Sequence, residues 1–200
     1  MYGYLGFLSY KRDPEMDIWH DQVRRKLETY IRMEIGAPNN VRIYQDRSEI
    51  RSGQEWERSL TQGLALSPVL FAVFSGAYFA SEWCVAELRT FMEREDRLGL
   101  PRGTLIKAAA VCGCSGFPEW VNAIQYDNFA DEFVPGSAYW ETDKSVDFMQ
   151  GKLKRFATHS CELIRQMPEY SDEFPRLNKP EEQAITQFRP VLMPFQHLAA

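Results

Sequence analysis

A strongly apolar run, Val69–Phe74, is followed closely by the start of a helix, and these two segments constrain the fold more than any other part of the chain. A continuous apolar run of this length is typical of a strand buried on both faces of a parallel sheet. The helix begins near Ser81 and carries Trp83 and Glu87. Because residues four apart share one face of a helix, we expect the indole and the carboxylate to lie side by side. Ligands of open α/β sheets bind beyond the carboxyl ends of the strands, so this edge is the candidate site.

Short apolar runs alternate with helical patterns over most of the chain. The runs predict strands at residues 4–10, 41–44, 69–74 and 105–111, with a further short strand near 124–126. Apolar residues at helical spacing predict helices over residues 17–35, 56–66, from 81 onward and over 146–164. Asp17 is the expected N-cap of the first helix, and Gly36 begins the segment that ends it. This alternation predicts a mostly parallel sheet with helices on both faces.

The composition argues against several classes of protein. The chain has 200 residues, of which 44% are hydrophobic and 26% charged, and its net charge is -5. These values suit a soluble domain with a short appendage and without a basic surface for nucleic acid. No apolar run reaches the length of a membrane helix, and no secretory signal is visible. The cysteines and histidines lack the spacing of metal ligands, and the cysteines favour a reduced, cytoplasmic protein. These residues are Cys84, Cys112, Cys114, Cys161, His20, His159 and His197.

The composition changes beyond Met167. Prolines punctuate a polar and acidic stretch over residues 168–200. We therefore expect one domain over residues 1–167 and a linker or surface-bound tail over residues 168–200. The apolar segment Phe188–Phe195 either packs on the domain or leads to a second domain.

Four segments in series resemble the Toll/interleukin-1 receptor (TIR) domain family, and in particular its bacterial members. They are Phe7–Tyr10, Asp46-Arg47 with Ile50 and Gly53, Ser75–Tyr78 with Ser81–Cys84, and Glu87. The resemblance covers roughly residues 4–165, and within it residues 112–140 depart from the family pattern. It implies a flavodoxin-like α/β fold, a three-layer sandwich with a mostly parallel central sheet.

The TIR family contains adaptors that self-associate and enzymes that cleave NAD+ and release nicotinamide. The enzymes carry a catalytic glutamate on the helix after the third strand, where this chain has Glu87. One carboxylate is sufficient in principle, because nicotinamide leaves as a neutral molecule and the barrier lies in the positive charge that develops on the ribose. The resemblance therefore implies an NAD+ nucleosidase that gives ADP-ribose or a cyclic isomer, acts in prokaryotic antiphage immunity and needs no cofactor.

Two alternatives remain for Glu87. In structural terms, the alternative is that Glu87 is a solvated helix acid, as most glutamates are. In functional terms, the alternative is a non-enzymatic TIR–TIR interaction module. The third reading is another flavodoxin-like enzyme, such as a nucleoside deoxyribosyltransferase, which also uses a glutamate on a ribose. The Trp-Cys-x-x-Glu context around Glu87 favours the TIR reading over this last one.

Further candidate substrate-binding residues lie at the same edge of the sheet. Ser9, Tyr10 and Arg12 follow the first strand, and a guanidinium suits the pyrophosphate of NAD+. Asp46 is a candidate to accept a hydrogen bond from a ribose hydroxyl or to orient Arg12. Trp83 is a candidate for a wall of the pocket. Each has a structural alternative, as a surface arginine, a loop-capping aspartate or a core tryptophan.

The loop after the second strand is charged and has a single apolar anchor, Ile50, while Gly53 is expected to serve the turn into the next helix. A loop of this kind gains little by packing on its own domain. We therefore expect Ile50 to contact another TIR domain. The resemblance implies activation by association into a homo-oligomer or filament, with a fused or partner sensor domain.

Overall fold

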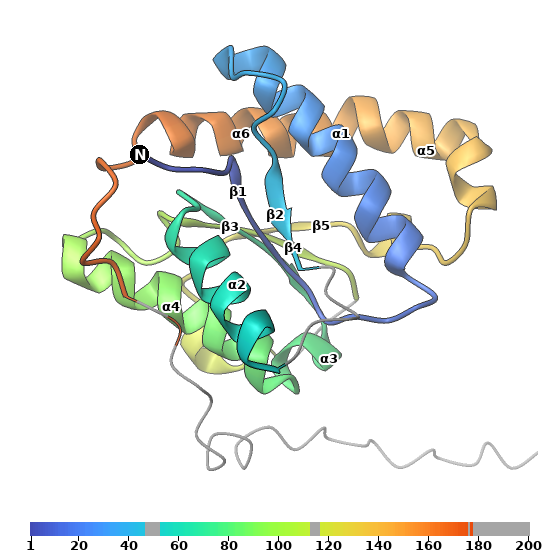
Figure 1. The fold of residues 1–200 in the computed structure, drawn as a ribbon. Coiled ribbons are helices and arrows are strands. Elements are labelled where there is room, and N and C mark those ends of the chain that lie inside the picture. Colours follow the sequence, from blue (N-terminus) through green and yellow to red (C-terminus); the bar gives the residue numbers. More distant parts are fainter. Residues whose placement is uncertain (47–52, 113–116, 176, 178–200) are drawn as a thin grey trace, which may run out of the picture.

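The structure is a computed structural model that describes residues 1–46, 53–112, 117–175 and 177. Within these residues a parallel sheet forms the centre of the molecule, with the strand order β2-β1-β3-β4-β5 (Figure 1). The strands are β1 (Gly6–Ser9), β2 (Ile43–Gln45), β3 (Leu70–Phe74), β4 (Ile106–Ala110) and β5 (Tyr126–Asn128). This is the flavodoxin-like order, whose switch point lies between β1 and β3, and the predicted fold class is confirmed.

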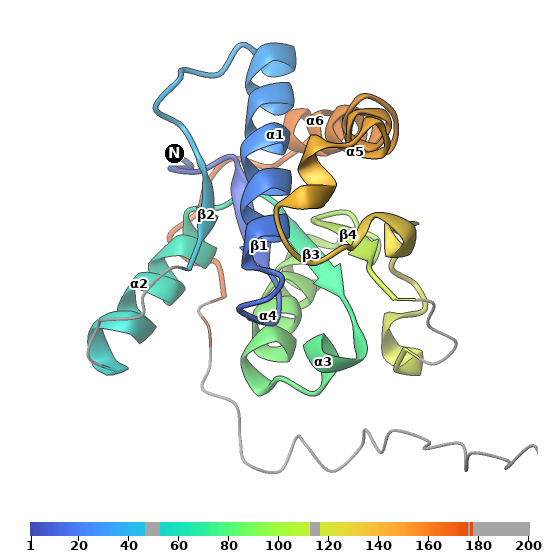
Figure 2. The ribbon, with the colours of Figure 1, turned by 90° about the vertical axis from the view of Figure 1, so that its right-hand side faces the viewer.

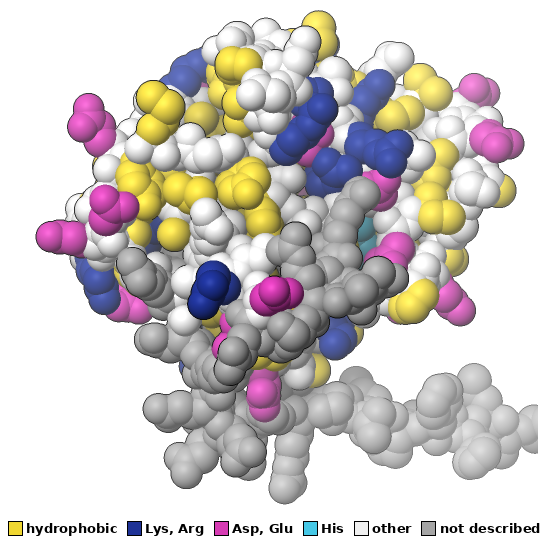
Figure 3. Space-filling view, viewed as in Figure 1, with side chains coloured by type: hydrophobic (Ala, Val, Ile, Leu, Met, Phe, Trp, Pro, Cys, Tyr) yellow, Lys and Arg dark blue, Asp and Glu magenta, His cyan; other side chains and the backbone are white. Residues whose placement is uncertain are grey.

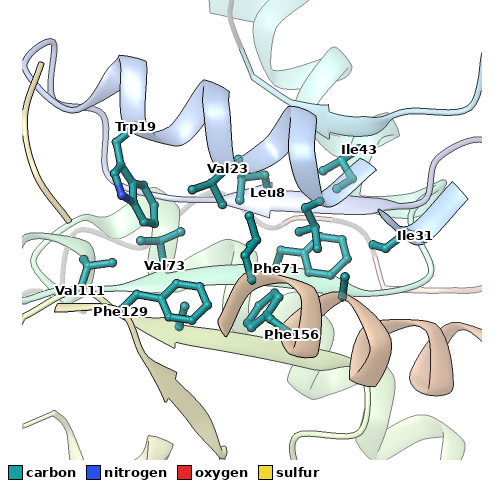
Figure 4. Packing of buried hydrophobic residues seen from close by; sticks show 14 of the residues in the cluster. Leu8, Trp19, Val23, Ile31, Ile43, Phe71, Val73, Val111, Phe129 and Phe156 are labelled. Atoms are coloured by element: carbon teal, nitrogen blue, oxygen red, sulfur yellow. The ribbon is translucent and has the colours of Figure 1, made fainter. Parts of the chain in front are cut away.

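Helices cover both faces of this sheet (Figures 1 and 2). One face carries α1 (Asp17–Ile35), α5 (Asp143–Phe148) and α6 (Lys154–Arg165), and the other carries α2 (Gly53–Ala65), α3 (Gly76–Phe79) and α4 (Glu82–Leu98). Successive strand residues point to opposite faces and so feed two separate cores. Figure 4 shows the α1 and α6 core, where Trp19, Val23 and Ile31 pack over Leu8, Phe71 and Phe156.

The first helix has the predicted bounds, but its N-cap differs from the prediction. Met16 occupies the N-cap position without a side-chain cap, so the prediction of Asp17 as N-cap is wrong. Asp17 is the first helical residue, where a carboxylate suits the helix dipole. The helix ends at Gly36, whose φ of 69° lies in the left-handed region that glycine adopts without steric cost.

The last helical segment is longer and less regular than predicted. It begins at Asp143, where Thr142 caps α5 through its side chain, and a π-helical segment, Met149–Leu153, separates α5 from α6. Short 3₁₀ turns lie among residues 119–141, in the part of the chain that departs from the TIR pattern. No helix among the described residues is long and apolar enough to cross a membrane.

The start of the proline-rich segment packs on the domain. The Tyr2 hydroxyl donates to the backbone oxygen of Pro168 (3.1 Å), and the Tyr2 ring lies near those of Tyr170 and Phe174. The expected boundary at Met167 stays a prediction, and Phe188–Phe195 lies outside the described residues.

The cysteines differ in part from the expectation of a reduced protein. Cys84 and Cys161 are free and buried. Cys112 is disulfide-bonded, so that expectation is wrong for Cys112.

Lys and Arg side chains gather over α1 beside β2 (Figure 3). Arg24, Arg32 and Arg42 lie around the buried carboxylate of Glu28, at 2.5, 3.9 and 3.9 Å. The same carboxylate accepts from the backbone N–H of Ile43 (3.0 Å). These contacts attach the edge strand β2 to α1, and they give the basic residues a structural role.

Two adjacent buried charges attach α4 to the sheet. The Arg94 guanidinium donates to the backbone oxygens of Leu64 (3.1 Å) and Ser67 (2.7 Å), where α2 ends. The Glu95 carboxylate accepts from the backbone N–H of Leu105 (2.7 Å), just before β4. Both side chains are fully buried. The helix that carries Glu87 is thereby held to both neighbouring chain segments.

We expect Arg94→Met to destabilise the protein by about 2–4 kcal/mol, because it leaves the buried backbone oxygen of Ser67 without a donor and removes one of the two donors to that of Leu64. Arg97→Met is the matched control on the same helix, since Arg97 is an exposed partner of Glu93. Its effect should stay within about 0.5 kcal/mol. Urea unfolding followed by circular dichroism measures both, and equal midpoints for the two variants would contradict the role of Arg94.

Candidate functional site

The carboxyl end of β1 meets the second turn of α4 at a buried hydrogen bond. The Ser9 hydroxyl donates to Oε2 of Glu87 at 2.5 Å. The Ser9 oxygen also lies 2.9 Å from the hydroxyl of Tyr78, which comes from α3. Ser9 is 1% exposed and Glu87 7% exposed. The three side chains form a row that leads from the apolar core to the carboxyl edge of the sheet.

Burial controls the charge of Glu87. Burial raises the pKa of this carboxyl, the hydrogen bond from Ser9 lowers it, and the nearby negative charge of Asp46 raises it. Together these effects give a pKa of about 8. A glutamate with this pKa is mostly protonated at neutral pH in the ligand-free protein. It ionises when a positive charge arrives beside it.

A second group of side chains surrounds Asp46, just beyond β2. The Arg12 guanidinium donates to the backbone oxygen of Asp46 and lies 3.8 Å from its carboxylate. The indole N–H of Trp56 donates to the same carboxylate. The Trp56 ring meets the Trp83 ring edge to face, with centroids 4.5 Å apart. The structure thus links the loop after β1, the end of β2, α2 and the start of α4.

An open pocket of about 400 Å³ lies on the α1 side of this group. It is lined by Tyr10, Arg12, Asp17, Ile18, Asp21, Gln45 and Asp46. The Tyr10 hydroxyl accepts from Gln45 (2.8 Å), and the Tyr10 ring stacks on that of His20 at 4.0 Å. Glu87 is not part of this lining. Asp46 connects the two, because it lines the pocket and its charge acts on the pKa of Glu87.

The structure places the predicted site residues in three positions. Ser9 contacts Glu87 directly, Arg12 and Asp46 pair with each other beside Trp83, and Tyr10 faces the α1 pocket. Ile50 lies outside the described residues, and Gly53 is the first residue of α2.

Two residues of this edge were missed by the sequence analysis as site residues. Tyr78 belongs to the segment Ser75–Tyr78, which resembles the TIR family, but its contact with Ser9 joins residues that are 69 positions apart. Trp56 is one of the apolar residues whose spacing predicts the helix over residues 56–66, and only the folded structure brings it to Asp46.

Other chemistry finds little support at this edge. Burial, together with the charge of Glu87, raises the pKa of the Cys84 thiol to about 12, so this cysteine is a poor nucleophile. No group of three or more His, Cys, Asp or Glu side chains with metal-binding geometry occurs in the described part of the chain.

The fold and this edge together define a flavodoxin-like α/β domain with one buried carboxyl at its switch point. The family described as TIR domain matches residues 7–137, which is more than half of the chain, and the protein therefore belongs to the TIR domain family. A search of curated proteins found no match.

The pKa of Glu87 makes stability depend on pH. Between pH 4.5 and about 8 the unfolded chain has lost the Glu87 proton while the folded protein retains it, so stability falls as the pH rises. We expect Glu87→Gln to remove this fall. At pH 9 the variant should melt roughly 3 °C or more above the parent, and at pH 4.5 the two should agree.

Differential scanning calorimetry at the two pH values tests this. Glu93→Gln is the control, because Glu93 lies on the same helix as an exposed partner of Arg97. A Glu87→Gln variant that tracks the parent at both pH values would show that this carboxyl titrates normally.

Proposed function

We propose that this protein is an NAD+ nucleosidase, which cleaves the bond between nicotinamide and ribose and gives ADP-ribose or a cyclic ADP-ribose isomer. The observation that carries the proposal is the buried Glu87, hydrogen-bonded to Ser9 at the switch point of the sheet. Membership of a family with NAD-cleaving members supports it. The proposal needs no cofactor, since NAD+ is the substrate.

The chemistry suits a single buried carboxylate. The C1′–N bond breaks with its electron pair going to the nicotinamide nitrogen, which leaves neutral and needs no acid. Positive charge develops on the ribose, and ionised Glu87 stabilises it in surroundings that screen charge poorly. Water then adds to C1′ and loses a proton, which gives ADP-ribose. A ring nitrogen of the adenine in place of water gives the cyclic isomer.

The cationic nicotinamide ring also prepares Glu87 for this role. The free carboxyl is mostly protonated at neutral pH because of its burial. A positive charge beside it favours the ionised form, so binding of the substrate cation lowers the pKa of Glu87. The charge that catalysis needs is therefore produced when the substrate binds.

The neighbouring residues fit the rest of the substrate. Arg12 is 38% exposed at its side chain, so its guanidinium is accessible for the pyrophosphate. Asp46 lies next to it and is a candidate acceptor for a ribose hydroxyl. Trp83 is partly buried against Trp56 and offers an aromatic wall near Glu87. Tyr10 lines the α1 pocket together with Arg12 and Asp46, where a bound substrate would contact it.

The alternative is a non-enzymatic TIR–TIR interaction module. Glu87 is only 7% exposed, so the interpretation of this residue as a solvated helix acid is wrong. One observation favours the module: with a pKa of about 8 this carboxyl is mostly neutral in the resting protein and needs no catalytic role to be tolerated there. A direct assay for nicotinamide release separates the two functions.

The proposed setting is prokaryotic antiphage immunity in the cytoplasm. It rests on the resemblance to bacterial TIR domains. In this setting self-association into a homo-oligomer or filament activates the enzyme, and a fused or partner sensor domain supplies the trigger. The loop that carries Ile50 is the proposed contact between TIR domains.

We expect Glu87→Gln to reduce nicotinamide release from NAD+ by a hundredfold or more, because it removes the negative charge and keeps the size of the side chain. Nicotinamide and ADP-ribose isomers are quantified by mass spectrometry over a wide series of protein concentrations. The parent's specific activity should rise with concentration if association activates it.

Glu93→Gln is the control, since it changes an exposed carboxylate on the same helix. A folded Glu87→Gln variant that turns over NAD+ at the parent rate would remove Glu87 from catalysis. A parent that releases no nicotinamide at any concentration, even when tethered to an oligomer, would favour the interaction module.

Arg12→Ala should raise KM for NAD+ about tenfold or more with a smaller change in kcat, because the guanidinium binds the pyrophosphate away from the reacting bond. Arg25→Ala is the matched control, since Arg25 is an exposed arginine of α1 that pairs with Asp21. Steady-state kinetics measure both variants, and an unchanged KM together with an unchanged kcat would exclude Arg12 from the site.

A further inference from the structure

The buried Tyr78 hydroxyl contacts the Ser9 oxygen, and the Ser9 hydroxyl in turn contacts Glu87. Its side chain is fully buried, and its ring packs against Phe74 and Phe79 with centroids 5.4 and 5.2 Å away. Its backbone N–H donates to the Ser75 hydroxyl, which caps α3 (3.1 Å). The hydroxyl of Tyr78 is therefore held in place by the core and by the cap of its own helix.

The hydrogen atoms in this row have a defined order when Glu87 is ionised. A serine hydroxyl can donate one hydrogen bond, and Ser9 donates it to the carboxylate of Glu87. The 2.9 Å contact between the Ser9 oxygen and the Tyr78 hydroxyl must then have Tyr78 as donor. Burial raises the pKa of Tyr78 well above its ordinary value, so Tyr78 keeps its proton and stays a donor.

We propose that Tyr78 is a positioning residue for Glu87 and acts through Ser9. The Tyr78 hydroxyl donates to Ser9, which strengthens the donation from Ser9 to the carboxylate. This row fixes the orientation of the Glu87 carboxylate and favours its ionised form. The proposal rests on the proposed function for its kinetic consequences, but the effect on ionisation exists in the protein without substrate.

A purely structural role for Tyr78 makes a different prediction. If its hydroxyl only satisfies a buried oxygen, its removal changes stability and leaves the ionisation of Glu87 unchanged. If it supports the ionised carboxylate, its removal shifts the titration of Glu87 to higher pH. The pH dependence therefore distinguishes the two roles.

The test compares Tyr78→Phe, Ser9→Ala and the double variant by steady-state kinetics over a range of pH. We expect Tyr78→Phe to lower kcat roughly tenfold, to leave KM within about twofold, and to move the rising limb of kcat/KM upward by about half a pH unit or more. Because Tyr78 acts only through Ser9, the double variant should be no worse than Ser9→Ala.

Tyr139→Phe is the matched control, since Tyr139 is buried and its hydroxyl bonds to no other described residue. It should leave kcat and the pH profile unchanged. A Tyr78→Phe variant with the parent pH profile, or a double variant whose loss is the product of the single losses, would overturn the proposal.

A second measurement needs no enzymatic activity. The difference in melting temperature between each background and its Glu87→Gln derivative, plotted against pH, follows the titration of Glu87. Tyr78→Phe and Ser9→Ala should each move the midpoint of this curve to higher pH. An unmoved midpoint in Tyr78→Phe would overturn the positioning role of Tyr78. Moved midpoints in a protein that releases no nicotinamide would support the positioning role of Tyr78. In that case only the proposed nucleosidase function would be contradicted.

Discussion

The hydrogen bond between Ser9 and Glu87 is the interaction on which the candidate site depends. It joins the end of β1 to α4 at the switch point of the sheet, and it requires that an ionisable carboxyl be buried there. The cost of this burial is visible in the raised pKa of Glu87. A fold optimised for stability alone would place an apolar side chain or an amide at this position. The acid therefore stands where function and stability conflict, as candidate catalytic residues commonly do.

A comparison with the other buried acids shows how unusual Glu87 is. Glu28 is surrounded by arginines and a backbone N–H, and Glu95 accepts from two backbone N–H groups and pairs with Arg102. Both carboxyl groups have several donors around them and tie helices to neighbouring chain segments. Burial raises the pKa of Glu95 as well, but its backbone donors and Arg102 act in the opposite direction. In the described structure Glu87 accepts from the hydroxyl of Ser9 and has the like charge of Asp46 nearby. The donors around Glu28 and Glu95 suit a structural role. Glu87 has fewer donors, so a positive charge placed beside it would have a larger effect on its ionisation.

The sequence predicted the features that depend on local pattern. The bounds of α1 followed from its apolar spacing and from Gly36, and the buried strand β3 followed from the run Val69–Phe74. The four-residue α3 was missed because it is too short to show a helical period. The pairs Ser9–Tyr78 and Trp56–Asp46 were missed for another reason. Each joins segments that only the tertiary fold brings together, and hydrogen bonds of this kind leave no periodic signal in the chain.

The position of Asp46 connects the two halves of the candidate site. Its negative charge opposes the ionisation of Glu87, and Arg12 partly neutralises that charge by pairing with it. A phosphate group that drew Arg12 away would leave Asp46 less compensated and would disfavour an ionised Glu87. A ligand with both a phosphate and a cationic ring supplies the opposing charge beside Glu87 at the same time. By this balance of charges a phosphate alone disfavours ionised Glu87 and a cationic ring favours it. The proposed substrate NAD+ carries such a ring, and the proposed product ADP-ribose does not, so the proposed function predicts that only the substrate promotes the ionised form.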